Sequence, residues 1–243
     1  MRKLGIIQPG KIGDIIICLP IAKYYYDRGW TVIWPVDRRI IGNFVGYVDY
    51  VTFIPVDFDC RHSYRECYAA HCARIIDLSF SIPGANPHSS HEYMRNNTKF
   101  SFDEYKYFLA DVDFSEKWNL QITRNKNKEE ELYNKLVNHS GKYIVLQEQS
   151  SVCHIKAPIK TELDTVKIEP IIGYSVFDWL KILEKADKHV LIESCFMNLV
   201  DQMNIKTAEK YLMNTPLGMT ALEDGRLRGH PKLRMNWILM NKN

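Results

Sequence analysis

A glycine-rich turn that carries one carboxylate lies near the start of the chain. The turn GKIGD spans residues 10–14 and follows the apolar run LGII of residues 4–7. Glycines let the backbone turn tightly and let a ligand approach it closely. Asp14 is then either a helix-start carboxylate, stabilised by free N–H groups and the helix dipole, or a base held over a cleft. The turn matches neither the P-loop nor the G-x-G-x-x-G pattern.

A second candidate is the stretch LIESCFMNLVDQM, residues 191–203. A buried strand ends at Glu193 and Ser194, and a helix begins directly after it. Free amide groups at such a helix start can bind a phosphate. Ser194 would either cap the helix or hydrogen-bond the same phosphate, and a plain cap is the simpler interpretation.

Cysteines and histidines cluster in CRHSYRECYAAHC, residues 60–72. Five soft ligands within 13 residues suggest zinc, but their spacing matches no standard zinc motif. If residues 61–73 form a helix, Cys67 and His71 share a face and Cys72 is turned away. We therefore favour free cysteines and surface histidines, and we expect no metal site.

The last 19 residues, GRLRGHPKLRMNWILMNKN, carry five Lys or Arg and no acidic residue. Such a segment could contact a polyanion such as nucleic acid. We favour a solvated final segment in which Trp237 and Ile238 dock on the first half of the chain.

The elements that must position these residues alternate between strand and helix. Buried apolar runs predict strands, and longer amphipathic or charged stretches predict helices. In the first half we expect strands at 3–9, 29–36, 50–56 and 74–80, and helices at 14–26, 40–48, 61–73 and 101–112, with a loop over 81–97. Ser101 and Glu104 have the spacing of a capping box.

A polar stretch at residues 123–128 marks the expected boundary, and a second alternation follows it. We expect strands at 142–148, 165–168, 189–194 and 209–213, and helices at 175–186 and 195–203. The fold class is therefore α/β, with two Rossmann-like lobes over residues 1–122 and 129–243 that face a cleft at the carboxyl ends of the strands.

Composition is that of a globular protein. The 243 residues are 46% hydrophobic and 25% charged, and the net charge of +3 alone implies no polyanion partner. The start of the sequence has only a four-residue apolar stretch, so we expect no signal peptide. No apolar run approaches the ~20 residues that span a bilayer. Six scattered cysteines favour reduced thiols and a cytoplasmic location.

Three segments resemble family 9 glycosyltransferases, the ADP-heptose heptosyltransferases: KLGIIQPGKIGDIIICLPIAKYY, CARIIDLSF and ADKHVLIESCFMNLVDQM. Glu193-Ser194-Cys195 stands where that family has D-T-G, and Asn198 stands at its histidine position. The resemblance implies a GT-B fold and an inverting transfer from a nucleotide-diphosphate sugar. It places the catalytic base at Asp14.

The resemblance also implies where the donor is bound. The leaving diphosphate would be met by the helix start after residue 193 and by Ser and Lys side chains from the loop QEQSSVCHIK. The implied donor-binding residues are Gly13, Ser150, Ser151, Lys156, Glu193, Ser194, Cys195, Phe196 and Asn198. No metal ion and no further cofactor are expected.

The expected function is thus inverting, metal-independent glycosyl transfer to an acceptor hydroxyl. The acceptor is either a saccharide or a hydroxymethylated base in DNA, which such an enzyme would have to expose. The alternative is a non-catalytic nucleotide- or partner-binding module that has the same fold.

Overall fold

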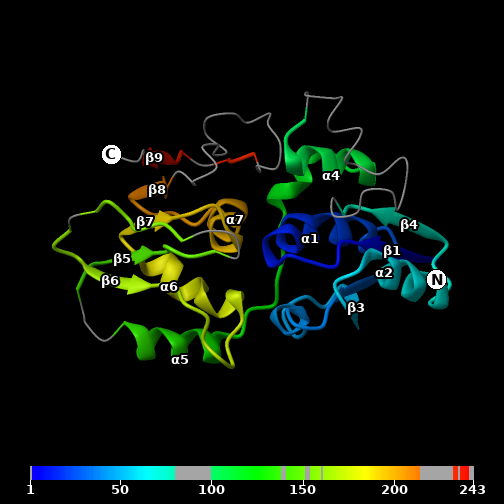
Figure 1. The fold of residues 1–243 in the computed structure, drawn as a ribbon, viewed down its shortest axis with the longest axis horizontal. Helices are drawn as coiled ribbons and strands as arrows, with labels where there is room; N and C mark the ends of the chain where they lie inside the picture. Colours follow the sequence, from blue (N-terminus) through cyan, green and yellow to red (C-terminus); the bar gives the residue numbers. More distant parts are fainter. Residues whose placement is uncertain are drawn as a thin grey trace. The chain divides into compact units, whose positions relative to one another are not determined.

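The computed structural model describes residues 2–79, 100–137, 141–150, 154–159, 161–213, 232–234 and 236–240. These residues form two compact α/β units (Figure 1). The first unit holds the described residues up to Thr123 together with Lys232. The second holds those from Arg124 to Met213 together with those from Leu233 onward.

The first unit is built on a four-stranded parallel sheet. Its strands are β1 (Arg2–Ile7), β2 (Trp30–Asp37), β3 (Val51–Val56) and β4 (Arg74–Asp77), in the order β3-β2-β1-β4. The central strands are apolar and buried along most of their length, as parallel strands covered by helices must be. All four carboxyl ends therefore lie along one edge of the sheet.

In the described residues of this unit, three α-helices pack on the sheet: α1 (Ile12–Tyr26), α2 (Cys60–Ala69) and α4 (Phe102–Ala110). Helices α1 and α4 also pack on each other. Ser101 caps α4 and Glu104 completes the capping box, as the sequence predicts. The glycine in β1 has a packing role, because a Cβ at Gly5 would lie 2.6 Å from Cys67 Sγ. Only glycine leaves room for α2 to approach β1 this closely.

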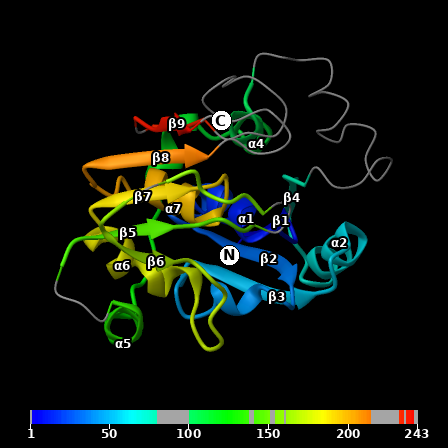
Figure 2. The same cartoon turned by 60° about the vertical axis from the view of Figure 1, so that its left-hand side comes forward.

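The second unit has a five-stranded parallel sheet. Figure 2 shows its strands side by side in the order β6-β5-β7-β8-β9. Their bounds are β5 (Tyr143–Leu146), β6 (Asp164–Lys167), β7 (Lys188–Leu191), β8 (Glu209–Met213) and β9 (Ile238–Met240). The α-helices are α5 (Lys126–Leu136), α6 (Leu180–Lys185) and α7 (Cys195–Gln202). In the described part of the chain no helix is long and apolar enough to cross a membrane.

Three expected helices are shorter than the sequence suggests. In 40–48 only a 3-10 turn, η1 (Ile41–Asn43), forms, because Gly46 adopts a φ of 86° that ends helical geometry. The helix expected at 61–73 stops at Ala69, and His71 adopts a φ of 55°. The stretch 175–186 opens with a 3-10 turn, η3 (Val176–Trp179), before α6 begins. A further 3-10 turn, η2 (Phe114–Trp118), follows α4.

The expectation that Trp237 and Ile238 dock on the first half is wrong. Ile238 begins β9, which pairs in parallel with β8 of the second unit at Tyr211. The buried Trp237 donates from Nε1 to Asp201 Oδ1 at 3.1 Å, also in the second unit. The open edge of β8 supplies backbone partners that the sequence pattern of this tail does not reveal. The loop expected at 81–97 lies outside the described residues.

Candidate functional site

Asp14 lies in the first turn of α1, directly after the turn that leaves the carboxyl end of β1. Its side chain is partly buried. Among the described residues, the hydrogen bond to its carboxylate comes from the Lys11 amide, with an N···O distance of 3.4 Å. That distance exceeds the usual 2.7–3.2 Å range, so helix capping satisfies this carboxylate only weakly. The side chain therefore keeps acceptor capacity for a ligand.

The turn before Asp14 is fixed by the neighbouring strand β2. Trp34 Nε1 donates to the Gln8 carbonyl at 3.0 Å, and the Asp37 amide donates to the Pro9 carbonyl at 2.7 Å. A Cβ at Gly10 would lie 2.8 Å from the ring of Phe58, so any other residue here would require this exposed ring to move. Two hydrogen bonds from β2 therefore fix the backbone that leads to Asp14.

A lysine that the sequence analysis did not single out contacts this turn. Lys106, on α4, is fully buried and donates from Nζ to Gln8 Oε1 at 2.6 Å and to the Leu78 carbonyl at 2.7 Å. Gln8 Nε2 in turn donates to the Gly10 carbonyl. The ammonium group of Lys106 therefore hydrogen-bonds to the residues that directly follow β1 and β4.

The electrostatic surroundings of Asp14 act in opposite directions. Burial raises the pKa of the Asp14 carboxyl, while the positive charge of Lys106, the Lys11 amide and the Lys11 charge act to lower the pKa. A carboxylate whose pKa is raised is a stronger proton acceptor. Gly13, an expected donor-binding residue, also lies in this first turn of α1 and so belongs to the first unit.

In the second unit Ser194 is the N-cap of α7. Its Oγ accepts from the Phe196 and Met197 amides at 3.2 and 3.4 Å, and donates to Gln147 Oε1 at 2.5 Å. The described contacts are thus those of a helix cap. Gln147 directly follows β5, and β5 pairs with β7 in the sheet. The Ser194–Gln147 bond therefore joins the two adjacent loops from which the expected donor site is built.

Asn198 lies one turn into α7 and is buried, and in the described part of the molecule its Oδ1 has no hydrogen-bond partner. A buried oxygen without a partner is costly, so this acceptor suits a donor group from a ligand. Phe196 is buried and packs edge-on against Trp179, with ring centroids 5.7 Å apart. Burial raises the pKa of Cys195 to about 12, so its thiol stays neutral. Glu193 is partly buried beside them.

The loop after β5 contains the remaining expected donor-binding residues. The Ile155 amide donates to the Glu148 carbonyl at 2.8 Å, and Ile155 packs into the core of the second sheet. Lys156 is exposed and Ser150 is partly buried. Ser151 lies outside the described residues. The structure thus places Ser150 and Lys156 in a loop whose neighbour along the sheet edge is the start of α7.

The cysteine and histidine cluster does not converge on one point. Cys60 Sγ donates to Ser79 Oγ at 3.2 Å. Cys67 and Cys72 lie together beside Gly5 in the core, so the expectation that Cys72 is turned away is wrong, because the helix ends at Ala69. His62 is turned to Asp57 at 3.8 Å. Among the described residues, no three His, Cys, Asp or Glu side chains are grouped so that they could hold a metal ion.

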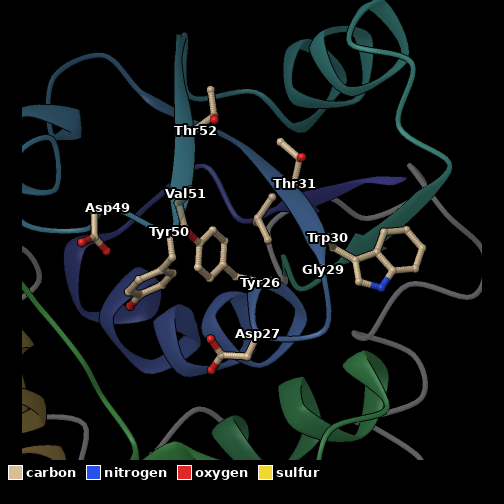
Figure 3. A pocket seen from close by; sticks show the side chains of 10 residues that line it. Tyr26, Asp27, Gly29, Trp30, Thr31, Asp49, Tyr50, Val51 and Thr52 are labelled. Atoms are coloured by element: carbon tan, nitrogen blue, oxygen red, sulfur yellow. The ribbon is translucent and has the colours of Figure 1, made fainter. Parts of the chain in front are cut away.

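An open hollow of about 630 Å³ lies in the first unit at the amino ends of β2 and β3 (Figure 3). Tyr26, the last residue of α1, lines it, whereas Asp14 lies in the first turn of that helix. Two of the polar side chains that line the hollow already have partners in the protein. Tyr50 OH donates to the Gln121 carbonyl at 2.9 Å, and the Asp27 carboxylate pairs with Lys23 at 2.5 Å. We assign no ligand to it.

Comparison with known proteins links this fold to one class of enzyme structure. No protein-family model matches the sequence, and no curated protein matches it. A family 9 glycosyl transferase from Veillonella parvula DSM 2008 superposes with a TM-score of 0.62 at 11% identity, over 98% of this chain and 86% of that one. The ADP-heptose LPS heptosyltransferase II of E. coli gives 0.54 at 9% identity, over 99% and 90%.

A third structure, the iron-containing dodecameric glycosyltransferase TibC of enterotoxigenic E. coli H10407, gives a TM-score of 0.52 at 9% identity, over 90% of this chain and 60% of that one. These likenesses concern the fold. They confirm the expected class, α/β with two Rossmann-like units, and its resemblance to family 9 glycosyltransferases.

Proposed function

We propose that this protein is an inverting, metal-independent glycosyltransferase that moves a sugar from a nucleotide-diphosphate sugar to an acceptor hydroxyl. The observation that carries the proposal is Asp14: a partly buried carboxylate, weakly satisfied, at the carboxyl end of a parallel sheet in a fold shared with glycosyltransferases. That edge of an α/β sheet is where ligands bind.

In the proposed reaction, the acceptor oxygen attacks the anomeric carbon and its proton passes to the Asp14 carboxylate. The bond between the anomeric carbon and the phosphate oxygen breaks, and the nucleoside diphosphate leaves with the bonding electrons. Attack from the face opposite the leaving group inverts the anomeric centre.

The donor-binding part of the proposal assigns the diphosphate to the start of α7. Helix N-terminal amides and a serine hydroxyl suit a phosphate, and the Asn198 oxygen offers an acceptor for a donor hydroxyl. Lys156 is exposed in the adjacent loop and supplies a positive charge on a long, flexible side chain. Ser150, Ser151, Glu193, Cys195 and Phe196 complete the proposed donor site of the second unit. Gly13 belongs to the first unit, and its donor-binding role stays a prediction from the resemblance.

Metal independence rests on the kind of residues present. Leaving-group charge can be met by amides and lysine rather than by a cation, and the described residues offer no clustered set of metal ligands. A cytoplasmic location is part of the same proposal, supported by five free cysteines in the described residues.

The decisive test is a transfer assay on the wild type and Asp14→Asn, with a panel of nucleotide-diphosphate sugars. Asparagine caps a helix as well as aspartate does but cannot accept the proton. We expect turnover to fall about 10²–10⁴-fold in Asp14→Asn, with donor affinity unchanged. Retained turnover would remove Asp14 as the base.

The same assay distinguishes between the two acceptor classes, and between a glycosyltransferase and the non-catalytic alternative. Saccharide acceptors and hydroxymethylated DNA are offered in parallel, and the product identifies the class. The alternative is a non-catalytic nucleotide-binding module, for which the helix start at Ser194 is equally suited. Such a module would bind nucleotides in calorimetry and transfer no sugar with any pair of donor and acceptor.

A further inference from the structure

Burying the charged side chain of Lys106 costs folding free energy. Its side chain has no exposed surface, and removing an ammonium group from water costs several kcal/mol unless good partners compensate it. Apolar residues of similar size in such positions are often neutral or stabilising. A role beyond stability is therefore the simplest reason for a charge at this position.

The contacts of Lys106 lead to the turn that carries Asp14. Lys106 Nζ donates a hydrogen bond to Gln8 Oε1 at 2.6 Å, and Gln8 Nε2 donates one to the Gly10 carbonyl. Gly10 is joined to Lys11, whose amide is the described hydrogen-bond donor to Asp14. The second bond of Nζ, to the Leu78 carbonyl at 2.7 Å, anchors the ammonium group to the end of β4.

Among the described residues, Lys106 is a buried positive charge that acts on Asp14, and the other charged and titratable groups nearby differ from it in exposure or charge. Lys11 is exposed, on the turn itself. Cys18, on α1, is a neutral thiol because burial raises its pKa to about 12. Asp103, on α4, is neutralised by Lys117 at 2.5 Å. Lys106 is thus placed to act on the charge of Asp14 through space.

We propose that Lys106 is the positioning residue of the Asp14 base: it fixes the 8–11 turn through Gln8 and supplies a buried positive charge that favours the ionised form of the carboxylate. This rests on the proposed function for its catalytic meaning. The physical claim, that Lys106 acts on Asp14, stands apart from it.

The kinetic test uses Lys106→Met, which removes the charge and the two hydrogen bonds described above, and Gln8→Leu, which breaks the link from Lys106 to the turn but leaves the charge in place. We expect kcat to fall in both variants. In Lys106→Met the acid limb of the profile of kcat/KM against pH moves to higher pH, because the carboxylate loses its compensating charge. In Gln8→Leu the limb stays in place. Lys106→Gln, neutral but still a donor, serves if Lys106→Met does not fold.

Lys210→Met is the matched control, since Lys210 is a buried lysine of the second unit that donates to the Thr207 carbonyl at 3.2 Å. We expect its acid limb to coincide with that of the wild type. An acid limb that stays in place in Lys106→Met, or one that moves equally in Lys210→Met, overturns the proposal.

A stability measurement tests the same claim without any activity. Asp14→Asn removes a carboxylate that burial disfavours, so it should raise Tm at pH 7 and leave Tm unchanged below the ordinary carboxyl pKa. We expect the rise to be larger in the Lys106→Met background than in the wild type. Equal rises overturn the proposal. If the rise in Tm is larger in the Lys106→Met background but no donor supports transfer, the proposed function is rejected and the action of Lys106 on Asp14 still stands.

Discussion

Ser194 combines two roles that a single substitution would confound. Its hydroxyl caps α7 and also holds Gln147, and in the proposed function it contacts the donor phosphate. Alanine removes all of these interactions. Asparagine removes the hydroxyl but still caps the helix and can donate to Gln147.

We therefore expect Ser194→Ala to lose about 1 kcal/mol of stability and to weaken donor binding by about 0.5–1.5 kcal/mol, more if the partner is charged. Ser194→Asn should keep the stability and still lose the donor contact. Thermal denaturation and calorimetric titration with a nucleotide-diphosphate sugar measure the two quantities. Wild-type donor affinity in both variants would leave Ser194 as a cap only.

Residues at strand-to-helix boundaries are the ones whose place in the fold the sequence predicts best. Asp14 and Ser194 each lie where an apolar run ends and a helix begins, so their place at the carboxyl edge of a sheet can be inferred. Lys106 and Gln147 cannot be inferred, because their contacts join positions 98 and 47 residues apart. Nothing in the local pattern of α4 marks one lysine as buried. The catalytic and donor-binding roles of the expected residues remain predictions.

Strand β7 contains a buried histidine that contacts helix α6 and the residues just before strand β8. His189 has no exposed surface, and its Nε2 lies 2.9 Å from the carbonyl of Leu183 on α6. Its Nδ1 lies 3.3 Å from Thr207 Oγ1, just before β8. The carbonyl requires a proton on Nε2, so Nδ1 accepts from the threonine. Burial lowers the pKa of His189 to about 4.

This histidine should make stability depend on pH. Between about pH 6.5 and 4 the unfolded chain binds a proton at this position and the folded chain does not, so stability falls as pH falls. The full loss is about 3 kcal/mol, from a pKa difference of 6.5 to about 4. Denaturant unfolding at a series of pH values should show a shallower slope for His189→Gln. The exposed His154→Gln is the control, and an identical slope in all three proteins would contradict this account.

Among the helices and strands, long apolar runs are the reliable signal. The buried strands β1, β2, β5 and β7 overlap the expected ranges, although β1 and β7 begin, and β2 ends, one residue outside them. Each of these strands pairs on both sides, so most of its residues must be apolar and buried. The short β9 is not predicted, since three residues at a sheet edge carry no periodicity. The 40–48 stretch is apolar enough for a helix, yet its glycine geometry decides against one.

For the protein as a whole, the proposed function predicts that a nucleoside diphosphate stabilises the folded state without added divalent metal. Binding to the folded state alone adds about 2.7 kcal/mol when the free ligand is at 100 times Kd. A thermal-shift titration in EDTA measures this, with the same titration in magnesium as its control. A thermal shift that vanishes in EDTA and returns with magnesium or manganese would reject the proposal that the enzyme works without a metal ion.

The route of the chain after Met213 also constrains how the protein is made. The Lys232 amide donates to both oxygens of the buried Asp103, at 2.9 and 3.0 Å, and β9 then completes the second sheet. Neither unit is therefore a contiguous segment of the sequence. During synthesis residues 2–123 leave the ribosome long before Lys232 is made, so Asp103 and Lys117 must wait for a partner that lies 129 and 115 residues further along the chain. Expression of residues 1–123 alone would leave that buried pair without it, and useful truncations must keep the tail.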